Sequence, residues 1–207
     1  MSSFKTEQEK FWAGDFGNEY TDRNKGSKMV ASNVVMFSAI LSKTRDIDTI
    51  IEFGPNRGAN LKAIRSIFPE AELSAVEINE VAVSKLKSLD PIKIYHQSLY
   101  DFTVDYQRDF VLSAGLLIHI NPEMLPKTYD IMYRASKRYI CIAEYYNPTP
   151  VEIMYRGEAG QLFKRDFAGE MLDTYSDLQL VDYGFVYHRD NNFPQDDVNW
   201  FLLEKRS

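Results

Sequence analysis

The sequence of 207 residues has a single cysteine, Cys141, and therefore lacks the partner needed for an intrachain disulfide. A chain without disulfides suits a reducing compartment. No apolar run is long enough to cross a bilayer, and residues 1–7 contain no apolar signal core. We therefore expect a cytoplasmic protein with no membrane partner.

Basic side chains are outnumbered, with 24 Lys and Arg against 30 Asp and Glu and a net charge of −6. Nucleic-acid binding leaves a basic footprint, so no nucleic-acid partner is expected. Internal repeats, low-complexity tracts and Pro/Gly-rich linkers are also missing, which predicts one domain over residues 1–207. No His/Cys/Asp cluster has metal-ligand spacing, and there is no nucleophile elbow. We expect no metal.

Short apolar runs alternate with amphipathic segments through the middle of the chain, which predicts parallel βαβ units with right-handed crossovers. Strands are expected at 49–53, 72–77, 93–96, 110–114 and 138–143. Helices should begin near Asn60, cover the residues before Pro91, and span 122–136. The fold class is therefore α/β.

The two ends of the chain depart from this alternation. Residues 1–46 should form a helical cap, with helices at about 6–12 and 27–43 and an aromatic loop containing Phe16 and Tyr20 between them. Residues 145–175 should form a substrate-side insertion: a polar, aromatic stretch over 145–160, then a helix at about 167–175. Segments 178–186 and 198–203 are expected to pair as an antiparallel hairpin.

The run Glu52-Phe53-Gly54-Pro55-Asn56-Arg57-Gly58 reads as the end of a buried strand followed by a glycine turn. In an open α/β sheet, a nucleotide-like cofactor lies beyond the carboxyl ends of the strands. An acid ending the second strand, here Glu77, can hydrogen-bond ribose hydroxyls. The two glycines could also simply form a turn, and Glu77 could be a solvated strand-end acid.

The type of cofactor follows from two departures from the dinucleotide fingerprint G-x-G-x-x-G. Asn56 stands where that pattern has its middle glycine, and Glu52 directly before the turn would repel a pyrophosphate. An acid suits a cationic amino group. S-adenosylmethionine has such a group, a ribose and no phosphate, so the motif favours it over NAD.

The same residues resemble class I S-adenosylmethionine-dependent methyltransferases. Glu52 to Leu61 looks like their motif I, Val76-Glu77 like the acidic second motif, and Gln97-Ser98-Leu99 like the adenine contact. Asp109-Phe110-Val111 through Leu117 to Glu123 resembles the motif around the fourth strand. The resemblance implies a Rossmann-like, mostly parallel seven-stranded sheet with an antiparallel last strand and helices on both faces.

A narrower resemblance covers nearly the whole chain. Phe11 to Tyr20, Glu144 to Glu152, Tyr155-Arg156-Gly157 and Phe163 to Phe167 look like the methylases associated with pseudaminic acid biosynthesis. This implies a nonulosonic-acid sugar, its precursor, or an acyl or amidino substituent on it as the methyl acceptor.

Candidate site residues follow from these motifs and from the cleft rule. The predicted cofactor-binding residues are Glu52, Gly54, Asn56, Gly58, Glu77, Ser98, Leu99 and Ser113. His119 could take a proton near neutral pH, or could be a structural histidine bonded to backbone, and Glu144 is a second candidate base. The candidate substrate-binding residues are Tyr145, Tyr155, Arg156 and Arg165, since arginine can bind a carboxylate or phosphate with two bonds.

The function expected from the sequence is transfer of a methyl group from S-adenosylmethionine to an oxygen or nitrogen of a small molecule, an anionic sugar according to the resemblance. Two alternatives stay open: a protein that binds the cofactor without catalysis, and a nicotinamide-dependent oxidoreductase. The identity of the acceptor, the atom methylated and the oligomeric state are left open by the residues.

Overall fold

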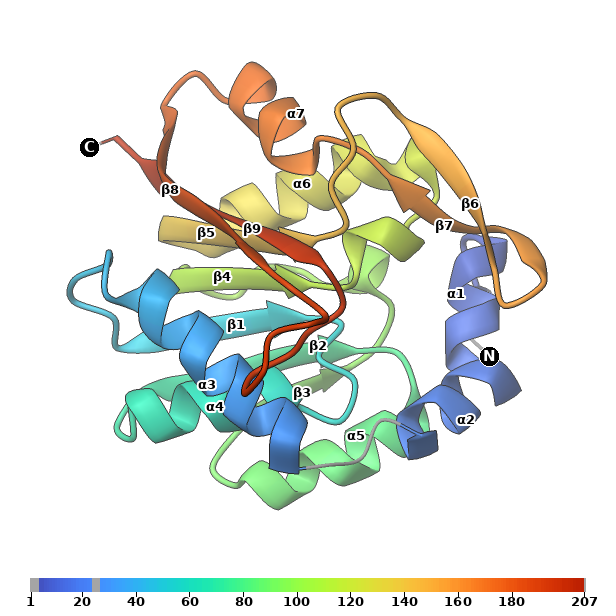
Figure 1. Ribbon diagram of the computed structural model, residues 1–207, viewed down its shortest axis with the longest axis horizontal. Coiled ribbons are helices and arrows are strands. Elements are labelled where there is room, and N and C mark those ends of the chain that lie inside the picture. The colour runs from blue at the N-terminus through green and yellow to red at the C-terminus, as the bar shows by residue number, and fades with distance from the viewer. Residues whose placement is uncertain (1–3, 24–26, 207) are drawn as a thin grey trace.

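The computed structural model describes residues 4–23 and 27–206 as a seven-stranded sheet with helices on both faces (Figure 1). The strand order is β3-β2-β1-β4-β5-β9-β8. Strands β1 to β5 pair in parallel, and β9 is antiparallel to both β5 and β8. The α/β class, the mostly parallel sheet and its antiparallel last strand are therefore confirmed.

Parallel central strands are buried on both faces, and here they are continuous apolar runs. The strands are β1 (Thr49–Phe53), β2 (Glu72–Glu77), β3 (Lys93–His96), β4 (Arg108–Ala114), β5 (Ser136–Glu144), β8 (Leu178–Val186) and β9 (Val198–Lys205). The helices are α1 (Glu7–Ala13), α2 (Asp15–Arg23), α3 (Ser27–Leu41), α4 (Ala59–Ile67), α5 (Glu80–Leu86), α6 (Leu125–Ala135) and α7 (Phe167–Thr174). Short 3-10 turns lie at Leu99–Asp101, Leu117–His119 and Pro122–Met124.

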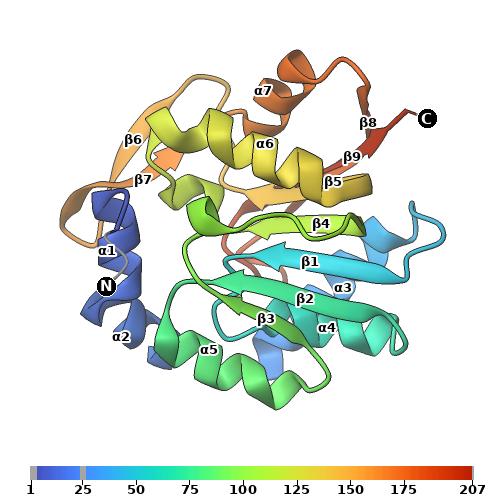
Figure 2. The same cartoon turned by 180° about the vertical axis from the view of Figure 1, so that it is seen from behind.

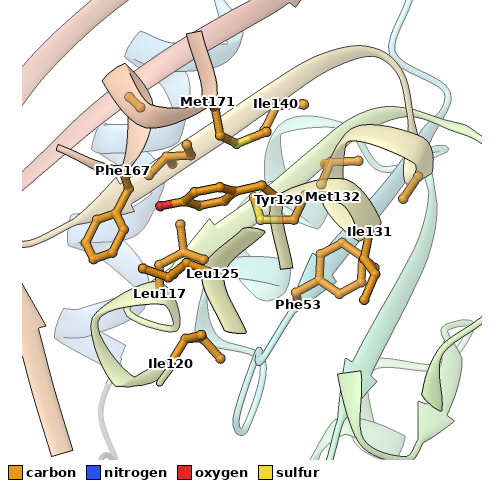
Figure 3. Close-up of a cluster of buried hydrophobic side chains, with 14 of the residues drawn as sticks. Phe53, Leu117, Ile120, Leu125, Tyr129, Ile131, Met132, Ile140, Phe167 and Met171 are labelled. Carbon is orange, nitrogen blue, oxygen red and sulfur yellow. The ribbon is translucent and has the colours of Figure 1, made fainter. Parts of the chain in front are cut away.

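Helices cover both faces of the sheet (Figures 1 and 2), and on each face an apolar core lies between the helices and the sheet. Helices α3, α4 and α5 cover one face through residues such as Phe37, Leu61 and Leu86. On the other face, α6 and α7 pack through Tyr129, Met132 and Met171, as Figure 3 shows. The Tyr129 hydroxyl donates to Glu170 Oε2 at 2.7 Å, so this polar atom is paired inside the apolar cluster.

The prediction of a loop between α1 and α3 is wrong, because residues 15–23 form helix α2. Phe16 and Tyr20 lie four residues apart and so share one face of α2, where both rings contact Trp12. Gly17 allows α2 to approach α1 closely, since a Cβ atom there would lie 1.8 Å from the Trp12 carbonyl oxygen. Gly14 alone separates α1 from α2.

The irregular stretch expected over 145–160 contains an antiparallel hairpin, β6 (Val151–Tyr155) and β7 (Glu158–Lys164). Its turn residues Arg156 and Gly157 both have positive φ, 53° and 90°. That geometry is typical of a two-residue type I′ turn, whose twist matches the flanking strands. In both views, β6 and β7 lie beside α1 at the carboxyl end of the sheet (Figures 1 and 2).

Several boundaries also differ from expectation. Helix α3 ends at Leu41, β4 already begins at Arg108, and Pro122 opens a 3-10 turn that precedes α6. Strand β5 is longer at both ends than expected, and β9 continues to Lys205. Among the helices of residues 4–23 and 27–206, none is long and apolar enough to span a membrane.

Candidate active site

A cavity of about 470 Å³ opens at the carboxyl ends of the parallel strands. This is the edge of an α/β sheet at which ligands bind, and the volume falls within the range of small-molecule sites. The loop after β1, the end of β2, the loop after β3 and the turn after β4 form its inner wall. Helices α1 to α3, Tyr155 at the end of β6 and the β8–β9 loop contribute the rest.

The loop after β1 bends sharply at residues whose backbones adopt left-handed conformations. The φ angles of Gly54, Asn56 and Gly58 are 66°, 50° and 78°. A Cβ atom on Gly54 would lie 2.8 Å from Leu116 Cδ1, so the loop also passes close to the turn after β4. Gly54 and Asn56 line the cavity, whereas Gly58 is buried against Leu86 and Leu89 and is not among the lining residues.

Glu77 lines the cavity and also holds the backbone around it. Its Oε2 accepts the Asn56 N–H and its Oε1 accepts the Asn79 N–H, both at 2.8 Å. Burial raises the pKa of this carboxyl group, although the backbone donors oppose that effect. A carboxylate has about four acceptor positions, so two backbone bonds leave capacity for ribose hydroxyls.

Glu52 is fully buried and lies behind the cavity wall, outside the lining residues. Its Oε1 accepts from Asn60 Nδ2 at 2.7 Å, and its Oε2 is buried without a partner among the described residues. Burial raises the pKa of Glu52 to about 8. Glu52 therefore does not reach the cavity itself. Its hydrogen-bond partner Asn60 does line the cavity.

The loop after β3 contributes Leu99 to the cavity together with Gln97 and Tyr100. Ser98 is not among the lining residues. Its hydroxyl donates to the Glu9 carboxylate of α1 and accepts the Tyr100 N–H at 3.0 Å. Ser98 therefore ties α1 to this loop.

Glu144 and Ser113 are joined at the ends of β5 and β4. Glu144 Oε1 accepts from the Ser113 hydroxyl at 2.8 Å and from the backbone N–H groups of Leu116 and Leu117 at 3.0 and 2.9 Å. Burial raises the pKa of Glu144 to about 7. Glu144 lines the cavity and Ser113 does not. The Ile118 N–H approaches the other oxygen, Oε2, at 3.5 Å. Because three consecutive backbone N–H groups, Leu116 to Ile118, point at its carboxyl group, Glu144 shapes the turn after β4.

His119 ends that turn and lines the cavity beside aromatic rings. Its ring centroid lies 4.4 Å from that of Trp12 and 5.1 Å from that of Tyr155. Nδ1 is 2.6 Å from the Gln161 carbonyl oxygen of β7, which requires the proton to be on Nδ1 and leaves Nε2 as an acceptor. Burial lowers the pKa of His119 to about 4, so the ring is neutral at pH 7.

The candidate substrate-binding residues divide into two groups. Tyr145 and Tyr155 line the cavity with Trp12 and Tyr20. Arg156 is exposed in the β6–β7 turn, with its guanidinium 5.7 Å from the Tyr155 ring centroid. Arg165 pairs with Glu170 at 2.7 Å. Neither arginine is among the lining residues.

Sequence reasoning missed polar residues that the fold brings to the cavity from a distance. Asn33 on α3 and Gln195 in the β8–β9 loop both line it. Asn33 Nδ2 donates to Asn60 Oδ1 at 2.7 Å. Neither belongs to a motif, so no local pattern marks it. No group of three or more His, Cys, Asp or Glu that could hold a metal occurs within 4–23 and 27–206.

Solved structures with the same architecture are found. The 1,6-didemethyltoxoflavin-N1-methyltransferase of Burkholderia thailandensis, solved with its substrate and S-adenosylhomocysteine, is 12% identical with a TM-score of 0.70 over 100% of this chain and 93% of its own. The chain has the fold of S-adenosylmethionine-dependent methyltransferases. The cavity described above lies at the carboxyl ends of the parallel strands, the edge at which open α/β sheets bind ligands.

Two further structures support the same fold. An amino pentose methyltransferase from Micromonospora echinaspora involved in calicheamicin biosynthesis, CalS10, is 10% identical with a TM-score of 0.62 and 99% of both chains covered. The plantazolicin methyltransferase BpumL is 12% identical with a TM-score of 0.61 over 92% of this chain and 90% of its own. No family model and no curated protein matches the chain.

Proposed function

We propose that this protein is an S-adenosylmethionine-dependent methyltransferase acting on an oxygen or nitrogen of a small molecule. The observation that carries the proposal is the single cavity wall in which Glu77, the glycine-bent loop and Leu99 adjoin His119. Glu77 and Leu99 suit the ribose and adenine of the cofactor. Asn56 stands where the dinucleotide fingerprint has its middle glycine, which disfavours the close approach of a pyrophosphate.

In the proposed reaction the sulfonium supplies an already activated methyl group, so the protein needs to align the acceptor and exclude water. The rings of Trp12, Tyr145 and Tyr155 enclose the His119 side of the cavity. His119 Nε2 is an unprotonated acceptor that can hydrogen-bond the hydroxyl or amide to be methylated. It is the candidate to take the proton that leaves, with a basicity that burial lowers until a bound acceptor changes its surroundings. We assign the acceptor to this side.

The acceptor that we propose is a nonulosonic-acid sugar, its precursor, or an acyl or amidino substituent on it. The family resemblance of the sequence supports this, and the sugar-modifying neighbour CalS10 is compatible with it. Residues 145–175, which supply Tyr145, Tyr155 and the Gln161 carbonyl, are proposed as the acceptor side. Residues 1–46, which supply Trp12 and Asn33, are proposed as a cap over the cofactor. Arg156 and Arg165 would have to turn toward the cavity to bind an anionic group.

The first experiment is calorimetric titration of the purified protein with S-adenosylhomocysteine and, separately, with NADH. We expect saturable binding of S-adenosylhomocysteine and none of NADH. The opposite result would establish the oxidoreductase alternative and refute the proposal.

The second experiment separates an enzyme from a non-catalytic binding protein. The protein is incubated with S-adenosylmethionine carrying a labelled methyl group and with nonulosonic-acid pathway intermediates, and products are analysed by mass spectrometry. We expect one intermediate to gain the labelled methyl group. Cofactor binding without transfer to any intermediate would favour the non-catalytic alternative.

A further inference from the structure

Three side chains form a continuous hydrogen-bonded chain at the cavity wall. Asn33 Nδ2 on α3 donates to Asn60 Oδ1 on α4 at 2.7 Å, and Asn60 Nδ2 donates to Glu52 Oε1 on β1 at 2.7 Å. Asn33 and Asn60 line the cavity, and Glu52 lies behind them. This series of hydrogen bonds therefore runs from the cavity surface to the buried carboxyl group of Glu52.

The hydrogen bonds give both amides one direction. Asn60 turns its amide nitrogen toward Glu52 Oε1, which accepts as a carboxylate oxygen or as the carbonyl oxygen of the protonated acid, and its amide oxygen toward Asn33. Asn33 must then present its own nitrogen to Asn60. Its Oδ1 remains as the acceptor available to a ligand in the cavity. A ligand group that donates hydrogen bonds is thus favoured at Asn33.

Five further unpaired polar atoms belong to residues of the same cavity. They are Gln8 Oε1, Trp12 Nε1, Asn56 Oδ1, Tyr100 Oη and Gln195 Nε2, each buried without a partner among the described residues. Buried polar groups are normally paired, and unpaired ones mark places where a ligand or water completes the bonding. Both acceptors and donors occur among them, and Gln195 Nε2 in the β8–β9 loop can only donate, so it suits a negative group of a ligand.

Building on the proposed function, we propose that Asn33 and Gln195 bind the zwitterionic amino acid end of the cofactor. Asn33 Oδ1 accepts from the α-ammonium group, and Gln195 Nε2 donates to the α-carboxylate. Asn60 and Glu52 are positioning residues that fix the Asn33 amide and do not touch the cofactor. Glu52, the acid at the end of β1, therefore orients the Asn33 amide that binds the amino group, and it does so through Asn60.

The test compares two probes that differ at this end of the cofactor. S-adenosylhomocysteine carries the amino acid group, and 5′-methylthioadenosine has the same adenosine thioether without it. The variants are Asn33→Leu and Gln195→Leu, which remove the amides at similar size. Ser38→Ala, at an exposed position of α3, is the matched control. Affinities are measured by calorimetry on the full chain.

We expect each leucine variant to lose about ten- to a hundredfold in affinity for S-adenosylhomocysteine, because a hydrogen bond to a charged group is lost. Affinity for 5′-methylthioadenosine should change less than about twofold, and Ser38→Ala should match the wild type for both probes. Equal losses for both probes, or no loss, would overturn the assignment. A wild-type protein that binds neither probe would refute the proposed function itself.

Discussion

Replacing Glu52 by glutamine should remove a large part of the pH dependence of stability. Glu52 is completely buried, and burial raises its pKa from 4.5 to about 8 in the folded protein. The nearby Glu77 carboxylate adds to the rise and the Asn60 amide opposes it. Glutamine keeps an oxygen for Asn60 and cannot ionise, so it changes the titration with little change in shape.

The sign follows from which state holds the proton more tightly. Below pH 4.5 Glu52 is protonated in both the folded and unfolded chains, and its contribution to stability is fully present. As the pH rises toward 8 the unfolded chain ionises while the folded chain keeps its proton, so the contribution is lost. Between pH 5 and 8, at about 1.4 kcal/mol per pH unit, the free energy of unfolding should fall by about 3–4 kcal/mol through this group.

Urea unfolding at pH 5 and pH 8 measures the effect. The difference in unfolding free energy between the two pH values should be about 3–4 kcal/mol smaller in Glu52→Gln than in the wild type. Glu70→Gln removes an exposed carboxyl group before β2 and should leave that difference unchanged. Identical pH dependence in the wild type and Glu52→Gln would contradict the assigned burial of the acid.

Three other changes test the cavity. Glu77→Ala should weaken S-adenosylhomocysteine binding by about 1–3 kcal/mol, because ribose hydroxyls and the Asn56 N–H lose their acceptor; unchanged affinity by calorimetry would exclude this role. His119→Ala should lower turnover by about a hundredfold or more while cofactor affinity stays within about twofold, and wild-type turnover would eliminate it as the base. The Gly54→Ala variant should have a lower melting temperature than Gly115→Ala. Both glycines have similar positive φ angles, 66° and 69°, but only at Gly54 would the added Cβ atom collide with Leu116. Equal melting temperatures would argue against that contact.

The central strands were predictable because burial on both faces makes each one a short apolar run with polar ends. The central strands β1 and β2 have the predicted limits, and so does β3, which lies at the edge of the sheet and is less buried. The hairpin β6–β7 was missed although its signal was present. Val151, Ile153 and Tyr155 alternate with Glu152 and Met154, and Arg156-Gly157 forms the two-residue turn. Because β6 and β7 form a separate two-stranded sheet, the residues of β6 stay largely exposed and the usual apolar pattern is weak there.

The candidate site shows a different limit on sequence reasoning. Residues that follow strands, such as Glu77 and His119, are marked by their position, because parallel strands bring their carboxyl ends to one edge. Asn33 and Gln195 come from a helix and a loop outside those units. Their positions depend on how α3 and the β8–β9 loop pack on the sheet. That packing cannot be predicted from the residues that neighbour them in the sequence.

The chemistry proposed for His119 depends on just such a distant contact. The ring alone could carry its proton on either nitrogen, and only the Gln161 carbonyl of β7, 42 residues further on, selects Nδ1. Residue pairing along β6–β7 determines which β7 carbonyl meets the ring, and a slip by one residue would turn the carbonyl away. The exposed hairpin therefore does more than enclose the acceptor side: by holding one backbone oxygen in place, it determines that Nε2 is the atom free to accept a proton.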